Sequence, residues 1–103
     1  MYLGVDVGGT NLAAGLTDEG GQILCKASVP VDRVWTDREI AGALARLCRM
    51  TAEKAGVPLE KIRAVGMGVP GQVDDKNGVV VHSPNMNFRD TPLKQLVEQQ
   101  AGI

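Results

Sequence analysis

Two adjacent glycines, Gly8 and Gly9, lie between two short segments with strand character, and they constrain this chain more than any other feature. Residues 2–16 are expected to form a strand, a tight turn and a second strand, since almost nothing separates the two apolar segments. Glycine has no side chain, so main-chain N–H groups in such a turn can come close to an anion. Asp6 places a carboxylate beside these groups, and the hairpin tip is therefore a candidate binding site.

Two better-known phosphate motifs do not fit the same residues. A dinucleotide fingerprint and a P-loop both lead from a strand into a helix, and the P-loop also needs a Gly-Lys-Ser/Thr sequence. After Gly9 the chain has further glycine and no helix cap, and the turn at residues 18–21 leads to a third strand at residues 22–29. The predicted phosphate loop is therefore a β-hairpin tip.

The carboxylate of Asp6 would repel a phosphate unless a divalent cation lay between them. The residue is therefore interpreted as a partner of Mg²⁺ or of its water shell. The alternative is a glycine turn that binds nothing, in which Asp6 only caps the turn.

Length, charge and hydropathy exclude several classes of protein. At 103 residues the chain is at most one domain, and a net charge of −1 gives no electrostatic case for nucleic acid or an anionic membrane. No apolar run approaches the roughly 20 residues that span a bilayer, and no signal peptide precedes the first strand. Cys25 and Cys48 lack the spacing of metal ligands. We therefore expect a cytoplasmic protein with two reduced thiols.

The middle of the chain predicts a helix and a further strand. Thr36 and Glu39 fit a capping box at the start of a helix that Gly56 ends. The segment Ile62–Val69 then predicts a strand, and because it is apolar on both faces towards its end, we expect it in the centre of a parallel region.

The last third predicts a short strand at residues 79–82, a loop at residues 83–90 and a second helix. Thr91 is expected to cap that helix, with Pro92 in its first turn and Gly102 just beyond its end. The element order is α/β, starting β-β-β-α-β. A further parallel strand is expected to begin at Ile103, so the chain is interpreted as truncated before it, with a sheet edge left open to another copy.

Three motifs together carry a resemblance to a known family. Asp6–Thr10, Gly66–Gly71 and Ser83–Asn85 occur in the order and at the separations seen in the N-terminal lobe of ROK (repressor, open reading frame, kinase) sugar kinases. The resemblance covers residues 1–103 and is closest to bacterial ATP-dependent glucokinases. It implies the ribonuclease-H-like, actin-like ATPase fold, with a mixed sheet and a second lobe that closes over a cleft.

The resemblance also implies roles for particular residues. The positions it assigns are Asp6, Gly8, Gly9, Thr10 and Asn11 for the ATP phosphates and Mg²⁺, and Gly71 and Asn85 for the sugar. Asn11 stands where the family often has lysine, which leaves the charge contribution of that position open. From the residues alone, Asn85 can equally form an Asx-turn, and Gly71 can serve only to allow a tight backbone turn.

By the same resemblance, the function is transfer of a phosphoryl group from ATP to the 6-hydroxyl of glucose. A different hexose or an N-acetylhexosamine is an alternative acceptor, and a sugar-responsive ROK repressor or an actin-like ATPase without a sugar site are further alternatives. A repressor is disfavoured because the first strand begins at Tyr2 and leaves no room for a helix-turn-helix.

The family's catalytic Asp and its zinc motif would lie beyond Ile103. Asp74 and Asp75 belong to a different turn and are not substitutes for that Asp. The 103-residue chain is therefore predicted to be inactive alone, because the attacking hydroxyl needs a base within hydrogen-bond reach. The intact protein is expected to form a homo-oligomer.

Overall fold

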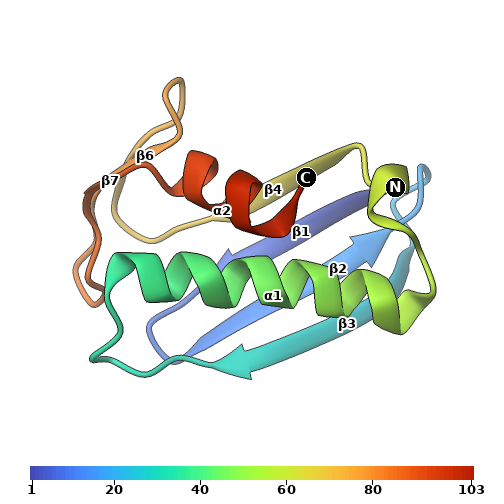
Figure 1. The fold of residues 1–103 in the computed structure, drawn as a ribbon, viewed down its shortest axis with the longest axis horizontal. Helices are drawn as coiled ribbons and strands as arrows, with labels where there is room; N and C mark the ends of the chain where they lie inside the picture. Colours follow the sequence, from blue (N-terminus) through green and yellow to red (C-terminus); the bar gives the residue numbers. More distant parts are fainter.

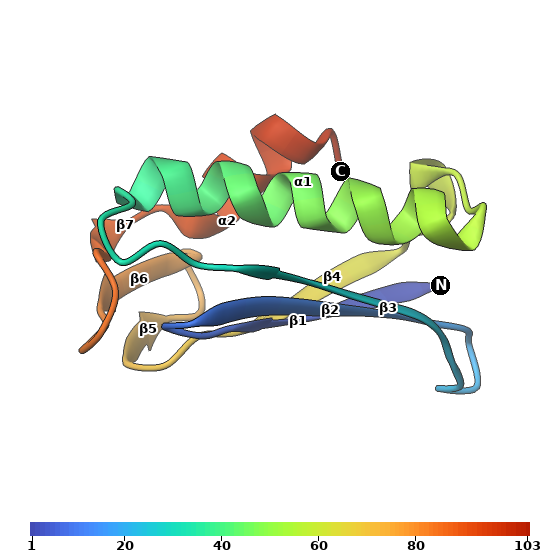
Figure 2. The same cartoon turned by 90° about the horizontal axis from the view of Figure 1, so that it is seen from below.

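The computed structural model describes all 103 residues and consists of one main sheet with two helices on the same side (Figures 1 and 2). The elements in chain order are β1 (Tyr2–Val7), β2 (Asn11–Thr17), β3 (Ile23–Pro30), α1 (Asp37–Ala55), a 3₁₀ turn (Leu59–Lys61), β4 (Ala64–Gly68), β5 (Gln72–Asp74), β6 (Val79–His82), β7 (Arg89–Thr91) and α2 (Leu93–Ala101). The predicted order β-β-β-α-β is confirmed. No helix is both long enough and apolar enough to cross a membrane.

The main sheet has the strand order β3-β2-β1-β4 and is mixed. β1 pairs antiparallel with β2, in a register that places Val7 opposite Leu12, and parallel with β4. Side chains alternate along β1, so Leu3, Val5 and Val7 are buried towards the helices. Asp6 is exposed on the opposite face, which no helix covers (Figure 2).

Helix α1 forms as its sequence predicts and supplies eight of the 21 buried core residues, more than any other element. The Thr36 hydroxyl accepts from the backbone N–H of Glu39 at 3.2 Å, while the Glu39 carboxylate accepts from the backbone N–H of Thr36 at 3.0 Å. This reciprocal capping box satisfies two N–H groups that the first turn leaves without helical partners. Gly56 ends the helix in the left-handed conformation with φ 68°.

The start of α2 differs from the prediction. Thr91 was expected to cap this helix, but it ends β7, and Pro92 occupies the cap position without a side-chain hydrogen bond. The Thr91 hydroxyl is fully buried and donates instead to the carboxylate of Asp37 at 2.8 Å. The Thr91 hydroxyl, which the local sequence pattern assigned to the helix cap, therefore binds a carboxylate 54 positions away in sequence. The predicted end at Gly102 is confirmed.

β4 was expected in the centre of a parallel region, and the structure confirms its parallel pairing with β1. Within residues 1–103 β4 is the last strand in the order, so its central position stays a prediction. Only Val65 and Met67 turn towards the helices, whereas Ala64, Gly66 and Gly68 are exposed on the other face.

A second, three-stranded antiparallel sheet follows, in the order β5-β6-β7. The sequence predicted β6 but neither β5 nor β7, which have three residues each. This small sheet lies at the end of the molecule where β1 finishes (Figure 2). It therefore brings the later part of the chain to the hairpin tip between β1 and β2.

Candidate functional site

The tip of the first hairpin is closed by a backbone hydrogen bond that requires glycine. Gly8 N–H donates to the carbonyl of Asn11 at 3.0 Å. A Cβ at Gly8 would lie 2.9 Å from that same oxygen, so any other residue would push the turn apart. β2 begins directly at Asn11, and no helix follows the glycine pair. The expected β-hairpin tip is thus confirmed.

Only part of the tip remains free to bind an anion. The N–H of Gly8 closes the turn, whereas the N–H groups of Gly9 and Thr10 have no acceptor within the chain. Thr10 and Asn11 are exposed, and Gly9 is half-buried. The sequence pointed to both glycine amides as donors, but the structure leaves those of Gly9 and Thr10.

Asp6 is the penultimate residue of β1, two positions before Gly8, and its side chain makes no hydrogen bond or salt bridge within the chain. Its side chain is exposed, and both salt bridges of the chain involve Glu19 at the opposite end of the hairpin strands. No group of three or more His, Cys, Asp or Glu side chains could hold a metal ion. A single free carboxylate fits Mg²⁺ only when phosphate oxygens and water supply the remaining ligands, which is the usual way that Mg²⁺ is held beside a nucleotide.

The loop that contains Asn85 lies against the hairpin tip. A methyl group placed on Gly9 would be 3.6 Å from Cβ of Asn85, an ordinary packing distance. The two residues are 76 positions apart in sequence, and each was assigned to a different ligand. The structure therefore brings the predicted phosphate loop and one predicted sugar residue together.

The turn at Gly71 holds this loop from the other side. Gly71 has a φ of 117°, and a Cβ there would lie 2.2 Å from the carbonyl oxygen of His82. The Ser83 hydroxyl donates to the carbonyl of Pro70 at 2.6 Å. The two segments are in such close contact that only glycine fits between them, and Asn85 follows Ser83 by two residues. Gly71 is thus joined to Asn85 through a short, anchored stretch.

Two further contacts fix this end of the molecule. The carbonyl of Thr10 accepts from Val31 N–H at 2.9 Å, which ties the tip to the segment after β3. The side-chain amide of Asn87 donates to the carbonyls of Trp35 at 2.7 Å and Arg33 at 3.2 Å. Both contacts attach the two candidate loops to the segment that leads into α1.

Ser83 and Asn87 position the loop. The sequence analysis placed Ser83 in a family motif without giving it a role, and it did not single out Asn87. Their partners are 13 and more than 50 positions away. A hydroxyl or amide in a loop gives no sign in sequence of which distant carbonyl it will reach. Only a three-dimensional arrangement reveals these residues.

The hairpin tip and the strand order together define the class of protein. A mixed sheet that starts β-β-β-α-β, with an acid and free main-chain donors at its first turn, is the lobe of an actin-like ATPase fold. The sequence pattern of the ROK family matches residues 2–103, and the chain belongs to this family.

Individual relatives agree with this assignment. A glucokinase of Streptomyces coelicolor is 41% identical over 103 residues, which are all of this chain and 30% of the relative. A putative xylose repressor of a Caldicellulosiruptor species is 31% identical over all of this chain and 26% of its own length. The crystal structure of a ROK family glucokinase from Streptomyces griseus, in complex with glucose and AMPPNP, superposes with a TM-score of 0.85 at 39% identity, covering 99% of this chain and 30% of that one. The chain therefore spans about a third of the length of the proteins it matches.

Proposed function

We propose that this chain forms the phosphate-binding and sugar-facing part of an ATP-dependent sugar kinase, with the 6-hydroxyl of glucose as the favoured acceptor. The observation that carries this proposal is the close approach of the Asn85 loop to Gly9, where an added Cβ would lie 3.6 Å from that of Asn85. It sets a nucleotide loop beside a polar loop able to bind hydroxyls. The glucokinase relative at 41% identity and the glucokinase structure with glucose and AMPPNP support the same reaction.

In this proposal each group at the tip has a distinct role. The free N–H groups of Gly9 and Thr10 donate to phosphate oxygens, and Gly8 shapes the turn. The Asp6 carboxylate holds Mg²⁺ or a water of its shell, and Asn11 borders the phosphates. Bound Mg²⁺ neutralises charge on the transferred phosphoryl group, which is most of what this reaction requires besides positioning.

The sugar lies on the other side of the same loop. The Asn85 side chain is exposed and makes no hydrogen bond within the chain, so its amide is free to bind a hydroxyl. Gly71 is exposed as well, and its lack of a side chain lets the backbone border the sugar. Ser83 keeps the two positions together through its hydrogen bond to Pro70.

The chain does not itself supply a catalytic base in this proposal. Asp74 accepts from the side-chain amide of Asn77 at 2.9 Å and is used in its own turn. We expect the catalytic Asp and the zinc motif to lie in the part of the family that this chain does not cover, and the 103-residue chain to be inactive alone. The intact protein is proposed to be a cytoplasmic homo-oligomer that binds no nucleic acid.

A sugar-responsive repressor is the second candidate, and the putative xylose repressor that matches the whole chain favours it. Such a protein would use the sugar loop without phosphoryl transfer. A kinase for another hexose or for an N-acetylhexosamine differs from the leading proposal only in the acceptor. Nucleotide binding separates the repressor from the kinases.

The test is a nuclear magnetic resonance titration of this chain with MgATP and, separately, with glucose. We expect MgATP to shift the amide signals of Gly9 and Thr10, and Asp6→Asn to weaken that binding about tenfold while glucose binding is retained. The control is Glu53→Gln, an equal change of charge on an exposed position of α1. Asn85→Ala should weaken glucose binding alone. Glucose binding without any response to MgATP would favour the repressor, and steady ADP release by this chain would contradict its proposed inactivity.

A further inference from the structure

The segment between β3 and α1, residues 31–36, contacts both candidate ligand loops, and we call it the bridging segment. At the hairpin tip, its Val31 N–H donates to the carbonyl of Thr10 at 2.9 Å. At the Asn85 loop, residues 83–88, two of its carbonyls accept from the side-chain amide of Asn87. The tip, the bridging segment and the Asn85 loop thus lie together at the end of the molecule where α1 begins (Figure 1).

The hydrogen bond from Val31 is the last one between the strands β2 and β3. The pairing of these strands ends at Asn11 with Pro30, and Val31 extends it by one bond to Thr10. The last bond of a ladder opens readily unless the chain beyond it is held in place. Thr10 also carries one of the two free N–H groups of the tip. The position of the bridging segment therefore affects a donor that is proposed to bind phosphate.

The amide of Asn87 holds the middle of the bridging segment. A primary amide has two N–H donors, and Asn87 uses both, on the carbonyls of Trp35 at 2.7 Å and Arg33 at 3.2 Å. Inside the segment, the Asp32 carboxylate accepts from Val34 N–H at 3.1 Å and the Asp32 carbonyl accepts from Trp35 N–H at 3.0 Å. These local bonds shape the segment, whereas the amide of Asn87 ties it to a loop more than 50 positions away in sequence.

We propose that Asn87 is a positioning residue for both ligand loops, because its two hydrogen bonds fix the segment that the loops share. The inference rests on the proposed function for the roles of MgATP and glucose. Asn87 acts on the sugar through Asn85, two positions earlier, and on the phosphates through the bridging segment and Thr10. A substitution in the Asn85 loop should therefore weaken nucleotide binding as well, which two loops without a shared support would not show.

The first test needs no ligand and follows amide hydrogen exchange by nuclear magnetic resonance. In Asn87→Ala, the Val31 N–H should exchange about tenfold faster relative to the N–H of Ala14, because its bond to Thr10 loses the support of the segment beyond it. Ala14 lies in the middle of β2 and reports opening of the whole sheet. Asn87→Asp keeps the shape of the side chain but has no donor, so it should have the same effect.

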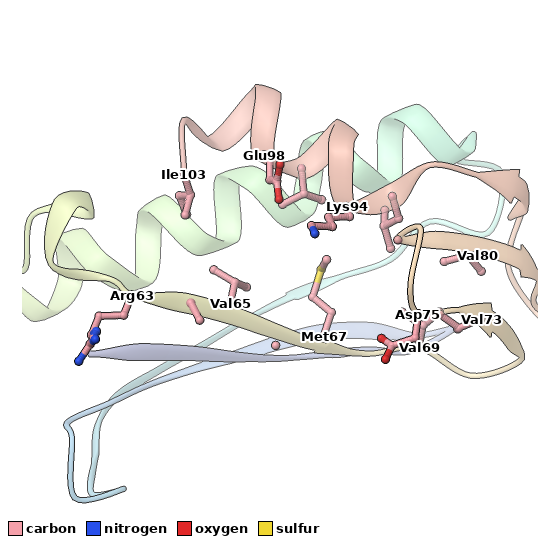
Figure 3. Close-up of a pocket in the computed structure, with 15 residues that line it drawn as sticks. Arg63, Val65, Met67, Val69, Val73, Asp75, Val80, Lys94, Glu98 and Ile103 are labelled. Carbon is pink, nitrogen blue, oxygen red and sulfur yellow. The ribbon is translucent and has the colours of Figure 1, made fainter.

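Asn77→Ala is the matched control. It also removes an amide that donates a hydrogen bond, here to the Asp74 carboxylate at 2.9 Å. Asn77 lies in the turn between β5 and β6, whose Asp75 borders a groove between β4 and α2 (Figure 3). No residue that lines this groove belongs to the bridging segment or to the Asn85 loop. The control should therefore leave the exchange of Val31 and the binding of both ligands unchanged.

The second test titrates the same variants with MgATP and, separately, with glucose. Asn87→Ala should weaken the binding of both about fivefold, because each loop loses part of its support. Asn85→Ala keeps the Cβ near Gly9 and should weaken glucose binding alone. The proposal is overturned if Asn87→Ala binds MgATP as tightly as the unsubstituted chain, or if Asn77→Ala weakens MgATP binding equally.

The two tests also separate this inference from the proposed function. An unchanged exchange rate of Val31 in Asn87→Ala would overturn the inference and leave the proposed function intact. An unsubstituted chain that responds to neither MgATP nor glucose would contradict the proposed function, and the ligand roles of Asn87 with it.

Discussion

Replacement of Gly71 by alanine should destabilise the fold far more than the same change at other glycines. Two separate penalties meet at this position. The φ of 117° is one that residues with a Cβ rarely adopt, and the added Cβ would lie 2.2 Å from the His82 carbonyl oxygen and 2.9 Å from Cα of Ser83. Both neighbouring atoms belong to the backbone, so neither can rotate away as a side chain would.

The size of the effect follows from these two penalties. A strained backbone conformation costs about 1–3 kcal/mol, and forcing extra volume into a packed site costs about 1–3 kcal/mol more. The two together predict a loss of about 2–6 kcal/mol in the free energy of unfolding. Domains of this size are stable by about 5–15 kcal/mol, so the variant should be marginal yet measurable.

Urea unfolding followed by circular dichroism measures the effect, and two control variants separate its causes. Gly4→Ala adds a Cβ with nothing within 4 Å and no unusual φ, so it should be neutral or slightly stabilising. Gly21→Ala has a φ of 87° but equally open space, so it reports the conformational cost alone, about 1 kcal/mol. With a denaturant dependence of about 1.5 kcal/mol per M, Gly71→Ala should lower the urea midpoint by about 1–4 M.

Comparison of the three glycine variants tests the close contact at Gly71. If Gly71→Ala is no less stable than Gly21→Ala, the close contact with His82 does not exist as described. The two loops would then not be held together by this turn. Sugar binding by the Gly71→Ala variant, measured where the variant is still folded, should also be weaker because Asn85 follows the same contact.

Three further predictions concern buried and terminal groups. Thr91→Val should cost about 1–3 kcal/mol in unfolding experiments, because it removes the 2.8 Å hydrogen bond to Asp37 Oδ2 and leaves the carboxylate with the Arg38 N–H alone. An unchanged midpoint would mean that water replaces the hydroxyl. The hydrogen bond from the N-terminal ammonium lowers the pKa of Glu19 below its ordinary value of 4.5. The stability that this pair contributes is therefore present above pH 4.5 and lost as the pH falls through the lowered pKa. In Glu19→Gln, the free energy of unfolding should no longer fall over that pH range. Burial raises the pKa of the Cys48 thiol above its ordinary value of 9.0. Cys48 should therefore react with a thiol reagent much more slowly than half-buried Cys25. Ionisation of the Cys48 thiol in the unfolded chain should also destabilise the fold as the pH rises above about 9. Equal rates for the two thiols would show that α1 opens readily.

Local patterns were sufficient to predict the first half of the fold. The Gly8–Gly9 turn, the capping box of Thr36 and the stop at Gly56 depend on contacts within a few residues, and the structure has all of them. The residues that interact in these features are close together in the sequence, so a sequence pattern predicts them directly.

Contacts between distant segments were not predictable in the same way. Thr91 has the chemistry of a helix cap, but Asp37 lies within reach and takes its hydroxyl. The contact of Gly9 with Asn85 depends on two strands of three residues each, too short to show any alternation. The residues of the candidate site could therefore be named from the sequence, whereas their arrangement could not.

Trp35 gives this arrangement a built-in optical reporter. It is the chain's single tryptophan, its side chain packs half-buried against the core, and its carbonyl accepts from Asn87. Loosening of the Asn85 loop would break that hydrogen bond and expose the indole to water, and the emission of an indole moves to longer wavelength as it becomes wetter. The protein's own fluorescence can thus follow loosening of the Asn85 loop in real time, without an attached dye.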